Sequence, residues 1–210
     1  MAVLDRTREL WERQDRAVGD RRPLYAAVAH AFEVRTVLYP GSYVDLAPSF
    51  VWPDVTYVDV DRRAARFFGD EAGVRALIAE RGGDGDAARF RFLPADYREP
   101  LELDEGAFDL LISLYAGPIS EHATHHLRLG GLLLVNPSHG DAALASIDDR
   151  YRVVGAVIGR SGRYRVDTEH LEDHLVPKRD VEVTRELVHR TGRGIAYTKA
   201  AFAYLFERVA

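Results

Sequence analysis

The chain has no cysteine among its 210 residues, and this absence excludes disulfide bonds, thiolate metal sites and cysteine nucleophiles. It also lacks long apolar runs. One of the longest, from Gly130 to Val135, is far shorter than the roughly 20 residues that a membrane-spanning helix needs. No signal-peptide pattern opens the sequence. We therefore expect a cytoplasmic protein that does not enter a membrane.

An excess of basic residues is missing as well. The formal net charge is −5 at pH 7 and the pI is near 5.9, which argues against a surface devoted to nucleic acid. Local arginine clusters remain, and Arg62, Arg63 and Arg66 could contact a phosphate. A solvated helix face is the default interpretation of this cluster.

The composition that remains, 47% hydrophobic and 29% charged, is typical of a soluble globular chain. A length of 210 residues suits one domain with a sizeable core. The sequence contains no internal repeat and no low-complexity segment. Oligomeric state is not readable from these features.

The stretch from Val37 to Asp61 carries most of the functional signal. Two runs rich in β-branched and aromatic residues, 37–39 and 55–61, flank a segment that begins Pro40-Gly41. A backbone can approach a ligand closely at Gly41, because glycine has no Cβ. Asp59 follows 18 residues later, close to the interval of about 20 between such a loop and an acid that binds ribose hydroxyls. This pattern is typical of the head of a nucleotide-type α/β domain.

Downstream, apolar runs alternate with helical patterns, which predicts a doubly wound, mostly parallel sheet. The N-terminus shows helical spacing, with Glu9–Arg13 and Glu12–Arg16 as possible i,i+4 pairs. The expected helices are 3–18, 23–32, 62–68, one ending near 82, 118–129, 169–175 and 181–189. The expected strands after 61 are 90–93, 108–114, 132–135, 151–158, 164–166 and 202–209, although 196–206 could instead be a helix.

In the stretch from Val37 to Asp61, the chain resembles the class I S-adenosylmethionine-dependent methyltransferases. The resemblance covers the order of elements from about Val37 to Ser138 and, more weakly, the tail. The family's first motif is usually an acid followed by a Gly-x-Gly-x-Gly loop, whereas residues 39–43 carry a single glycine. The resemblance implies a single domain over 1–210. It would comprise an N-terminal helical cap (1–35), a cofactor-binding core (36–140) and a C-terminal segment (141–210) that completes an α/β, Rossmann-like sheet of about seven strands, the last one antiparallel.

Ligands of doubly wound sheets bind beyond the carboxyl ends of the strands. Five stretches should therefore converge, namely 39–45, 59–61, 95–97, 113–117 and 136–139. The resemblance assigns the ribose to Asp59, with Asp61 as a possible substitute, and the adenine amino group to Asp96. Asp59 could instead cap a helix, and Asp96 could belong to an ordinary turn. The implied set for S-adenosylmethionine is Tyr39, Pro40, Gly41, Ser42, Tyr43, Asp45, Asp59, Asp61, Asp96, Ser113, Leu114 and Tyr115.

Transfer of a methyl group from a sulfonium depends mainly on placement, because the donor is already activated. A base is needed only when the acceptor must lose a proton, and His139 and Tyr115 are the candidates. For His139, a polar loop residue is the commoner case. A sulfonium cation is attracted to an aromatic face, so Tyr39, Tyr43 or Tyr115 could contact it. Buried structural tyrosine is the commoner case.

Three histidines, His122, His125 and His126, are spaced to share a helical face. Two imidazoles one turn apart can hold a metal, but the Glu of a metalloprotease helix is missing. We expect no metal site, with substrate contact or a packing face as the remaining interpretations. The family's Asn/Asp-Pro-Pro-Tyr signature for amino acceptors is also absent, and residues 113–116 occupy its place.

Three functions follow from these features. The first is a methyltransferase for an unidentified, small-molecule acceptor. The second is a non-catalytic binding or assembly protein that keeps the fold. The third is a nicotinamide-dependent oxidoreductase, which uses the same acid but needs a Gly-x-Gly-x-x-Gly loop that this chain lacks.

Overall fold

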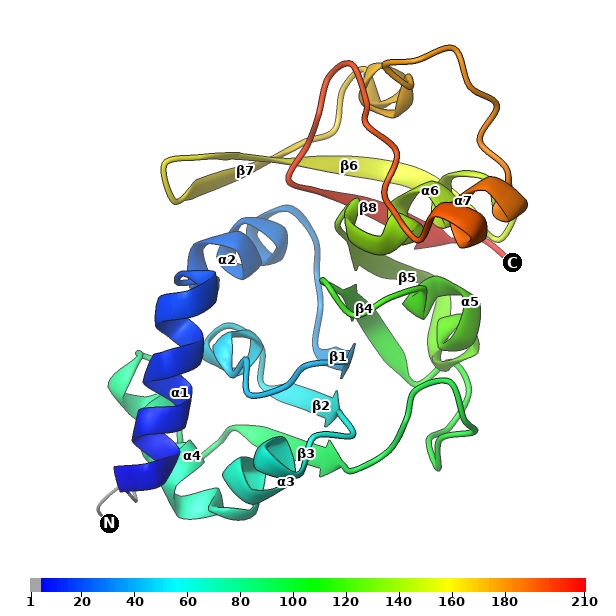
Figure 1. Ribbon diagram of the computed structural model, residues 1–210. Coiled ribbons are helices and arrows are strands. Elements are labelled where there is room, and N and C mark those ends of the chain that lie inside the picture. The colour runs from blue at the N-terminus through cyan, green and yellow to red at the C-terminus, as the bar shows by residue number, and fades with distance from the viewer. Residues whose placement is uncertain (1–4) are drawn as a thin grey trace.

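One twisted sheet of eight strands organises the computed structural model, which describes residues 5–210 (Figure 1). The strand order is β3-β2-β1-β4-β5-β8-β6-β7. Neighbouring strands from β3 to β5 pair in parallel, whereas β8 is antiparallel to both β5 and β6. The strands are β1 (Thr36–Pro40), β2 (Asp54–Val58), β3 (Arg89–Leu93), β4 (Phe108–Ser113), β5 (Leu127–Val135), β6 (Tyr151–Arg160), β7 (Arg163–Asp167) and β8 (Ala203–Arg208).

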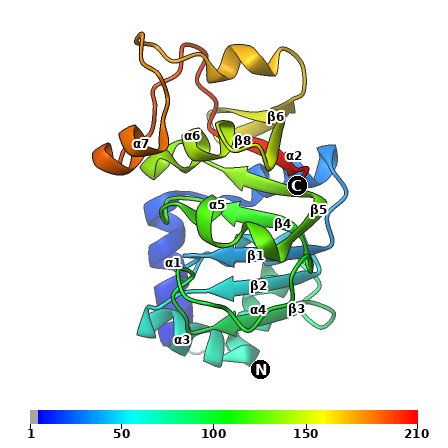
Figure 2. The ribbon, with the colours of Figure 1, turned by 90° about the vertical axis from the view of Figure 1, so that its right-hand side faces the viewer.

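This topology confirms the predicted fold class. The last strand, β8, is antiparallel as expected, and it pairs with β6 over the predicted segments. The alternative helix over 196–206 is wrong, because this segment contains no helix and its last residues enter the sheet as β8. The eighth strand is β7, which forms an antiparallel hairpin with β6 at the sheet edge (Figure 1). Figure 2 shows β3, β2, β1 and β4 stacked in this order.

Helices cover both faces of the sheet, as a doubly wound fold requires. Figure 1 shows α1 and α2 on one side of the sheet and α5 and α6 on the other. Among the described residues, no helix combines the length and apolar character needed to cross a bilayer. The α-helices are α1 (Asp5–Val18), α2 (Arg22–Ala31), α3 (Arg62–Gly69), α4 (Glu71–Glu80), α5 (Ile119–His122), α6 (Asp141–Ser146) and α7 (Arg185–Thr191). The 3-10 helices are η1 (Ala47–Phe50), η2 (Thr124–His126), η3 (Ser138–Gly140) and η4 (Leu171–Leu175).

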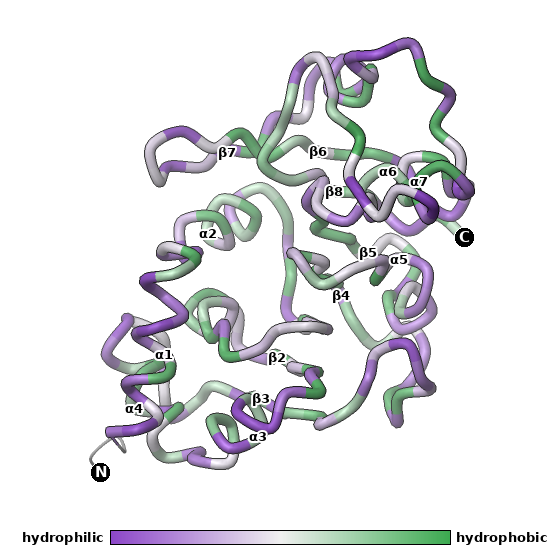
Figure 3. The backbone as a smooth tube through the Cα atoms, in the orientation of Figure 1, coloured by the Kyte–Doolittle hydropathy of each residue, from purple (hydrophilic) through white to green (hydrophobic). Residues whose placement is uncertain are grey.

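The core has two parts because side chains alternate along each strand. Val37 and Tyr39 face the cluster that includes Trp11 and Tyr25 from α1 and α2, whereas Leu38 faces the opposite cluster. The central strand β4 is apolar and buried on both faces over residues 110–112, and the tube of Figure 3 is largely hydrophobic along this strand. Burial on both faces is the reason why residues 108–114 form a nearly continuous apolar run in the sequence.

The predicted helix over 118–129 is wrong. Only Ile119–His122 is α-helical, and after the short η2 turn the strand β5 already begins at Leu127. Leu127 pairs with Phe108, and a register shift follows, so Gly130 and Gly131 lie within an irregular part of β5 rather than at a helix end. Pairing with β4 therefore overrides the helical spacing.

The other helix predictions are confirmed with changed bounds. The first expected helix starts at residue 3, but residues 3 and 4 lie outside the described part. The expected helix over 169–175 is the 3-10 helix η4, and the one over 181–189 is α7. The Glu12–Arg16 pair is present at 3.6 Å. The Glu9–Arg13 pair does not occur in residues 5–210, where Arg13 instead lines a groove.

A buried ion pair attaches the N-terminal helices to the loop after β1. An Arg21 guanidinium nitrogen lies 2.7 Å from an Asp45 carboxylate oxygen, and both side chains are at least 90% buried. Arg21 also donates to the Tyr39 hydroxyl at 3.0 Å. The hydroxyls of Tyr39 and Tyr25 donate to the same carboxylate at 3.1 and 3.3 Å. Asp45 thus belongs to this structural network.

The substitution Asp45→Asn should lower the free energy of unfolding by about 3–5 kcal/mol, because it leaves the Arg21 guanidinium buried without a counter-charge. Urea denaturation measures this change. The matched control is Glu33→Gln, whose partner Arg35 is exposed, and it should alter stability by less than about 0.5 kcal/mol. Equal effects of the two substitutions would contradict the structural role of the buried pair.

Candidate active site

The loop after β1 and the acid after β2 are joined by short hydrogen bonds. The Tyr43 amide donates to Asp59 Oδ2 at 2.7 Å, and the Asp61 amide donates to Asp59 Oδ1 at 2.8 Å. The Gly41 amide donates to the Val58 carbonyl at 2.8 Å. These bonds hold the loop against the carboxyl end of β2. The carboxylate of Asp59 therefore has one backbone donor on each oxygen.

Asp59 borders a cavity of about 380 Å³ beyond the carboxyl ends of the parallel strands, which we call the Asp59 cavity. It brings together residues that follow β1, β2, β3 and β4, as predicted for a doubly wound sheet. Gly41, Asp59, Asp96 and Tyr115 of the predicted set line it. The remaining lining residues are Val60, Ala95, Tyr97, Arg98 and Ala116.

A second cavity of about 480 Å³ borders the same loop and is rich in aromatic side chains. We call it the aromatic cavity. From the predicted set it includes Tyr39, Gly41, Ser42, Tyr43, Leu114 and Tyr115. Its other lining residues were not in the predicted set, and they are Gln14, Ala17, Val18, Arg21, Tyr164 and Phe202.

The two cavities share Gly41 and Tyr115, and a close contact lies at this common border. Gly41 has φ +66°, and a Cβ placed on it would come within 2.2 Å of the Ala116 Cβ. The absence of a side chain at Gly41 thus makes room for Ala116. The Tyr97 hydroxyl donates to the Ala116 carbonyl at 2.8 Å and fixes the other side of this residue.

Tyr115 and Tyr43 both have positive φ and both carry an arginine on the ring. The φ angles are +62° for Tyr115 and +47° for Tyr43. The Arg21 guanidinium carbon lies 5.3 Å from the centroid of Tyr115, and that of Arg63 lies 5.1 Å from the centroid of Tyr43. One cation therefore already faces each ring. Tyr39 is buried in the Asp45 network instead, where burial and the neighbouring carboxylate raise its pKa.

Asp96 lies on the rim of the Asp59 cavity but is engaged by its own turn. The Arg98 guanidinium donates to both carboxylate oxygens at 2.5–3.1 Å, and the Arg98 amide donates at 3.0 Å. The hydrogen bonds from Arg98 lower the pKa of Asp96 to about 2. The group is therefore a carboxylate over the whole physiological range.

Five predicted residues line neither cavity, namely Pro40, Asp45, Asp61, Ser113 and His139. Asp61 caps α3 by accepting from the Arg63 amide at 2.7 Å, and Asp45 is buried beside Arg21. His139 is exposed, and its Nδ1 lies 2.7 Å from the Ser138 hydroxyl. Pro40 is buried at the end of β1.

Ser113 belongs to a buried network around Asp141, which the sequence analysis did not single out. The hydroxyls of Ser113 and Ser120 both donate to the Asp141 carboxylate, and the Ser120 amide lies 3.2 Å from each carboxylate oxygen. Asp141 is 1% exposed. Burial raises its pKa to about 6, against the opposing effect of the two hydroxyl bonds. In the sequence, an acid at the start of a helix resembles an ordinary capping residue, so the burial of Asp141 between two serines could not be predicted.

The three histidines do not form one cluster on a helix. His122 packs edge-on against Tyr97 at 5.8 Å between ring centroids. His126 is buried, and its burial lowers its pKa. Residues 5–210 contain no group of three or more histidine, aspartate or glutamate side chains placed to hold a metal.

Comparison with known proteins identifies the fold. No family model and no curated protein matches the chain. Among solved structures, a proposed O-methyltransferase from Klebsiella pneumoniae superposes with a TM-score of 0.50 at 13% identity, over 79% of this chain and 89% of that one. A SAM-dependent methyltransferase from Thermotoga maritima matches 99% of both chains at 12% identity and a TM-score of 0.49.

A third structure, a proposed S-adenosyl-L-methionine-dependent methyltransferase from Methanococcus maripaludis, matches at 11% identity and a TM-score of 0.43. That match covers 65% of this chain and 66% of the other. At such low identities the likeness concerns the fold alone. Together with the strand order, the Klebsiella match shows that the chain has the Rossmann-like α/β fold of that proposed O-methyltransferase.

Gly41→Ala should destabilise the protein more than Gly19→Ala. Both glycines have positive φ, but nothing lies within 4 Å of a Cβ at Gly19. We expect a loss of about 1–2 kcal/mol at Gly19 from backbone strain alone, and about 1–3 kcal/mol more at Gly41 from the contact with Ala116. Adding Ala116→Gly to Gly41→Ala should recover the additional loss of stability that the contact with Ala116 causes. Equal urea unfolding curves for the two single variants would contradict the contact.

The raised pKa of Asp141 predicts a pH-dependent stability. A folded-state pKa of about 6, above the ordinary 3.8, stabilises the fold fully below pH 4, and the contribution is lost as the pH rises through 6. Relative to Asp141→Asn, the wild type should lose about 2.4 kcal/mol between pH 4 and pH 7, since one pKa unit corresponds to about 1.4 kcal/mol and the unfolded-state group is already half ionised near pH 4. Urea denaturation of both proteins at the two pH values measures the difference. If the free energies of unfolding of the two proteins changed by the same amount between the two pH values, the prediction would be wrong.

Proposed function

We propose that this chain binds S-adenosylmethionine and transfers its methyl group to a small-molecule acceptor. The observation that carries the proposal is the position of Asp59. Asp59 directly follows β2, its carboxylate is held by two backbone amides, and it borders a cavity that Asp96 also lines. The fold supports the proposal, because ligands of doubly wound sheets bind at this edge.

The residues at the Asp59 cavity fit the adenosine part of the donor. Each carboxylate oxygen of Asp59 accepts one backbone hydrogen bond and keeps further acceptor capacity, so it would receive hydrogen bonds from ribose hydroxyls. Asp96 remains ionised beside its arginine and would accept from the adenine amino group. When bound, the sulfonium donor supplies an activated methyl group, which leaves placement and exclusion of water to the protein.

The aromatic cavity is the proposed acceptor site. Its walls are apolar and aromatic, with Arg21 as the charged group, which suits a small molecule with an apolar body. Gln14, Ala17 and Val18 of α1 close one side of it, so residues 1–35 would act as a cap. His139 does not border this cavity, and Tyr115 is the predicted catalytic candidate that does.

One observation favours a non-catalytic binding protein instead. The contact between Gly41 and Ala116 lies at the border of the two cavities, where a donor and an acceptor would have to meet. The nicotinamide-dependent oxidoreductase has less support. After β1 the chain forms the 3-10 helix η1 rather than an α-helix, so no helix N-terminus faces a diphosphate there.

Titration calorimetry with S-adenosylmethionine, S-adenosylhomocysteine and NAD separates these functions. Binding of the first two ligands alone supports the proposal, and binding of NAD alone supports an oxidoreductase. Binding of none of them leaves the non-catalytic protein. A methyltransferase assay on a panel of small aromatic acceptors then tests turnover.

Asp59→Asn should weaken binding of S-adenosylhomocysteine at least about tenfold, because it removes charge-assisted hydrogen bonds worth about 1.5–3 kcal/mol. The matched control is Asp86→Asn, in an exposed loop after α4, which should bind as the wild type does. Circular dichroism of both variants checks that the fold is kept. Unchanged affinity in a folded Asp59→Asn protein would refute the assigned role.

A further inference from the structure

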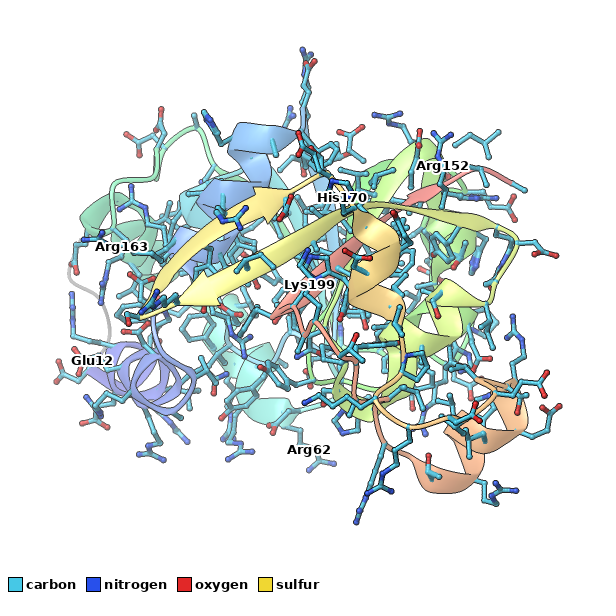
Figure 4. The ribbon with its side chains drawn as sticks, turned by 90° about the horizontal axis from the view of Figure 1, so that it is seen from above. Glu12, Arg62, Arg152, Arg163, His170 and Lys199 are labelled. Carbon is cyan, nitrogen blue, oxygen red and sulfur yellow. The ribbon has the colours of Figure 1, made fainter. Side chains whose placement is uncertain are left out.

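Outside the two cavities, a groove of about 230 Å³ lies between α1 and α3. Figure 4 shows these two helices side by side, with Glu12 on α1 and Arg62 on α3 both pointing outward. The side chains of Arg6, Arg13, Arg63 and Arg66 line this groove, which we call the arginine groove. Arginines from two helices therefore meet around one hollow.

The charge of the arginine groove is not balanced by the protein. Four arginines and one acid, Glu9, line it, so the lining has a formal charge of +3, which falls to +2 when Asp61, the partner of Arg63, is counted. Arg63 is paired with Asp61, which lies outside the lining, at 2.6 Å. In the described part of the chain, Arg6 and Arg13 have no carboxylate within 4.0 Å, and Arg66 donates to the backbone carbonyl of Arg62 instead.

The shape of the groove adds to this charge. Its floor includes Phe67, which is 1% exposed, whereas its arginines are exposed at the rim. Like charges above an apolar floor repel one another more strongly than in open water, because the low dielectric of the floor screens them less. A bound anion would relieve this repulsion. Guanidinium groups also match the oxygens of phosphate in two-pronged hydrogen bonds.

We infer that the arginine groove binds the phosphate group of a small molecule. Three arginines without a carboxylate partner and a formal charge of +2, with Asp61 counted, suit an anion with several oxygens and more than one negative charge. The chain's net charge of −5 argues against an extended nucleic acid as the source. This inference goes beyond the proposed methyl transfer and does not depend on it.

Titration calorimetry with pyrophosphate at low ionic strength tests the inference on the full chain. The wild type should bind, and affinity should fall as salt is added. Arg13→Gln and Arg66→Gln should each weaken binding by about five- to tenfold through loss of one charged fork. The control Arg16→Gln lies on the same helix, is exposed and does not line the groove, so it should bind within twofold of the wild type.

Ribose 5-phosphate and inorganic phosphate serve as further probes of the source of the anion. If ribose 5-phosphate binds more tightly than inorganic phosphate, and Arg13→Gln abolishes the difference, the ligand is a phosphorylated organic molecule. If the two probes bind equally tightly, the ligand is the free anion. Absence of pyrophosphate binding to the wild type overturns the inference. So does binding that Arg16→Gln weakens as much as Arg13→Gln, since the effect would then be general surface charge. Unchanged thermal unfolding shows that the variants remain folded.

Discussion

The buried ion pair between Arg21 and Asp45 is the interaction on which the candidate site depends. Arg21 begins the second N-terminal helix, Asp45 lies in the loop after β1, and the guanidinium also faces the ring of Tyr115 after β4. A single cation therefore holds three segments that form walls of the aromatic cavity. A buried charge is tolerated only with a complete set of partners, and here Tyr25 and Tyr39 complete it. The cavity and the stability of the fold thus share one network.

The loop after β1 shows how a single glycine can replace a glycine-rich motif. Two residues of this loop, Gly41 and Tyr43, have positive φ. Glycine adopts that conformation freely, whereas for tyrosine it costs about 1–2 kcal/mol. The short bond from the Tyr43 amide to Asp59 offsets this cost, because a carboxylate is a strong acceptor. The acid that would bind ribose therefore also stabilises the unusual loop.

Much of the sheet was predictable because buried strands are continuous apolar runs and turns carry glycine or acids. The helix over 118–129 was not, since Ile119, Ala123 and Leu127 recur four residues apart as in a helix, while the pairing of Leu127 with Phe108 lies outside any local pattern. Asp59 was predictable from its spacing to Gly41. Arg21 and Asp141 were not, because charged residues at helix starts resemble solvated ones, and only tertiary packing buries them.

The fold fixes where ligands would bind, but the difference between a transferase and a binding protein lies in one residue's position. Ala116 packs against Gly41 at the border of the two cavities and is flanked by Tyr115 and Gly117, with φ of +62° and +110°. Changes of backbone angle at these two residues would move Ala116 while β4 stays in place. If the donor occupies the Asp59 cavity and the acceptor the aromatic cavity, as we propose, methyl transfer requires the two to meet at this border and therefore requires Ala116 to move. Binding of adenosine beside Asp59 does not require Ala116 to move. A transferase thus needs a mobile segment over 115–117, whereas a binding protein is compatible with a rigid one.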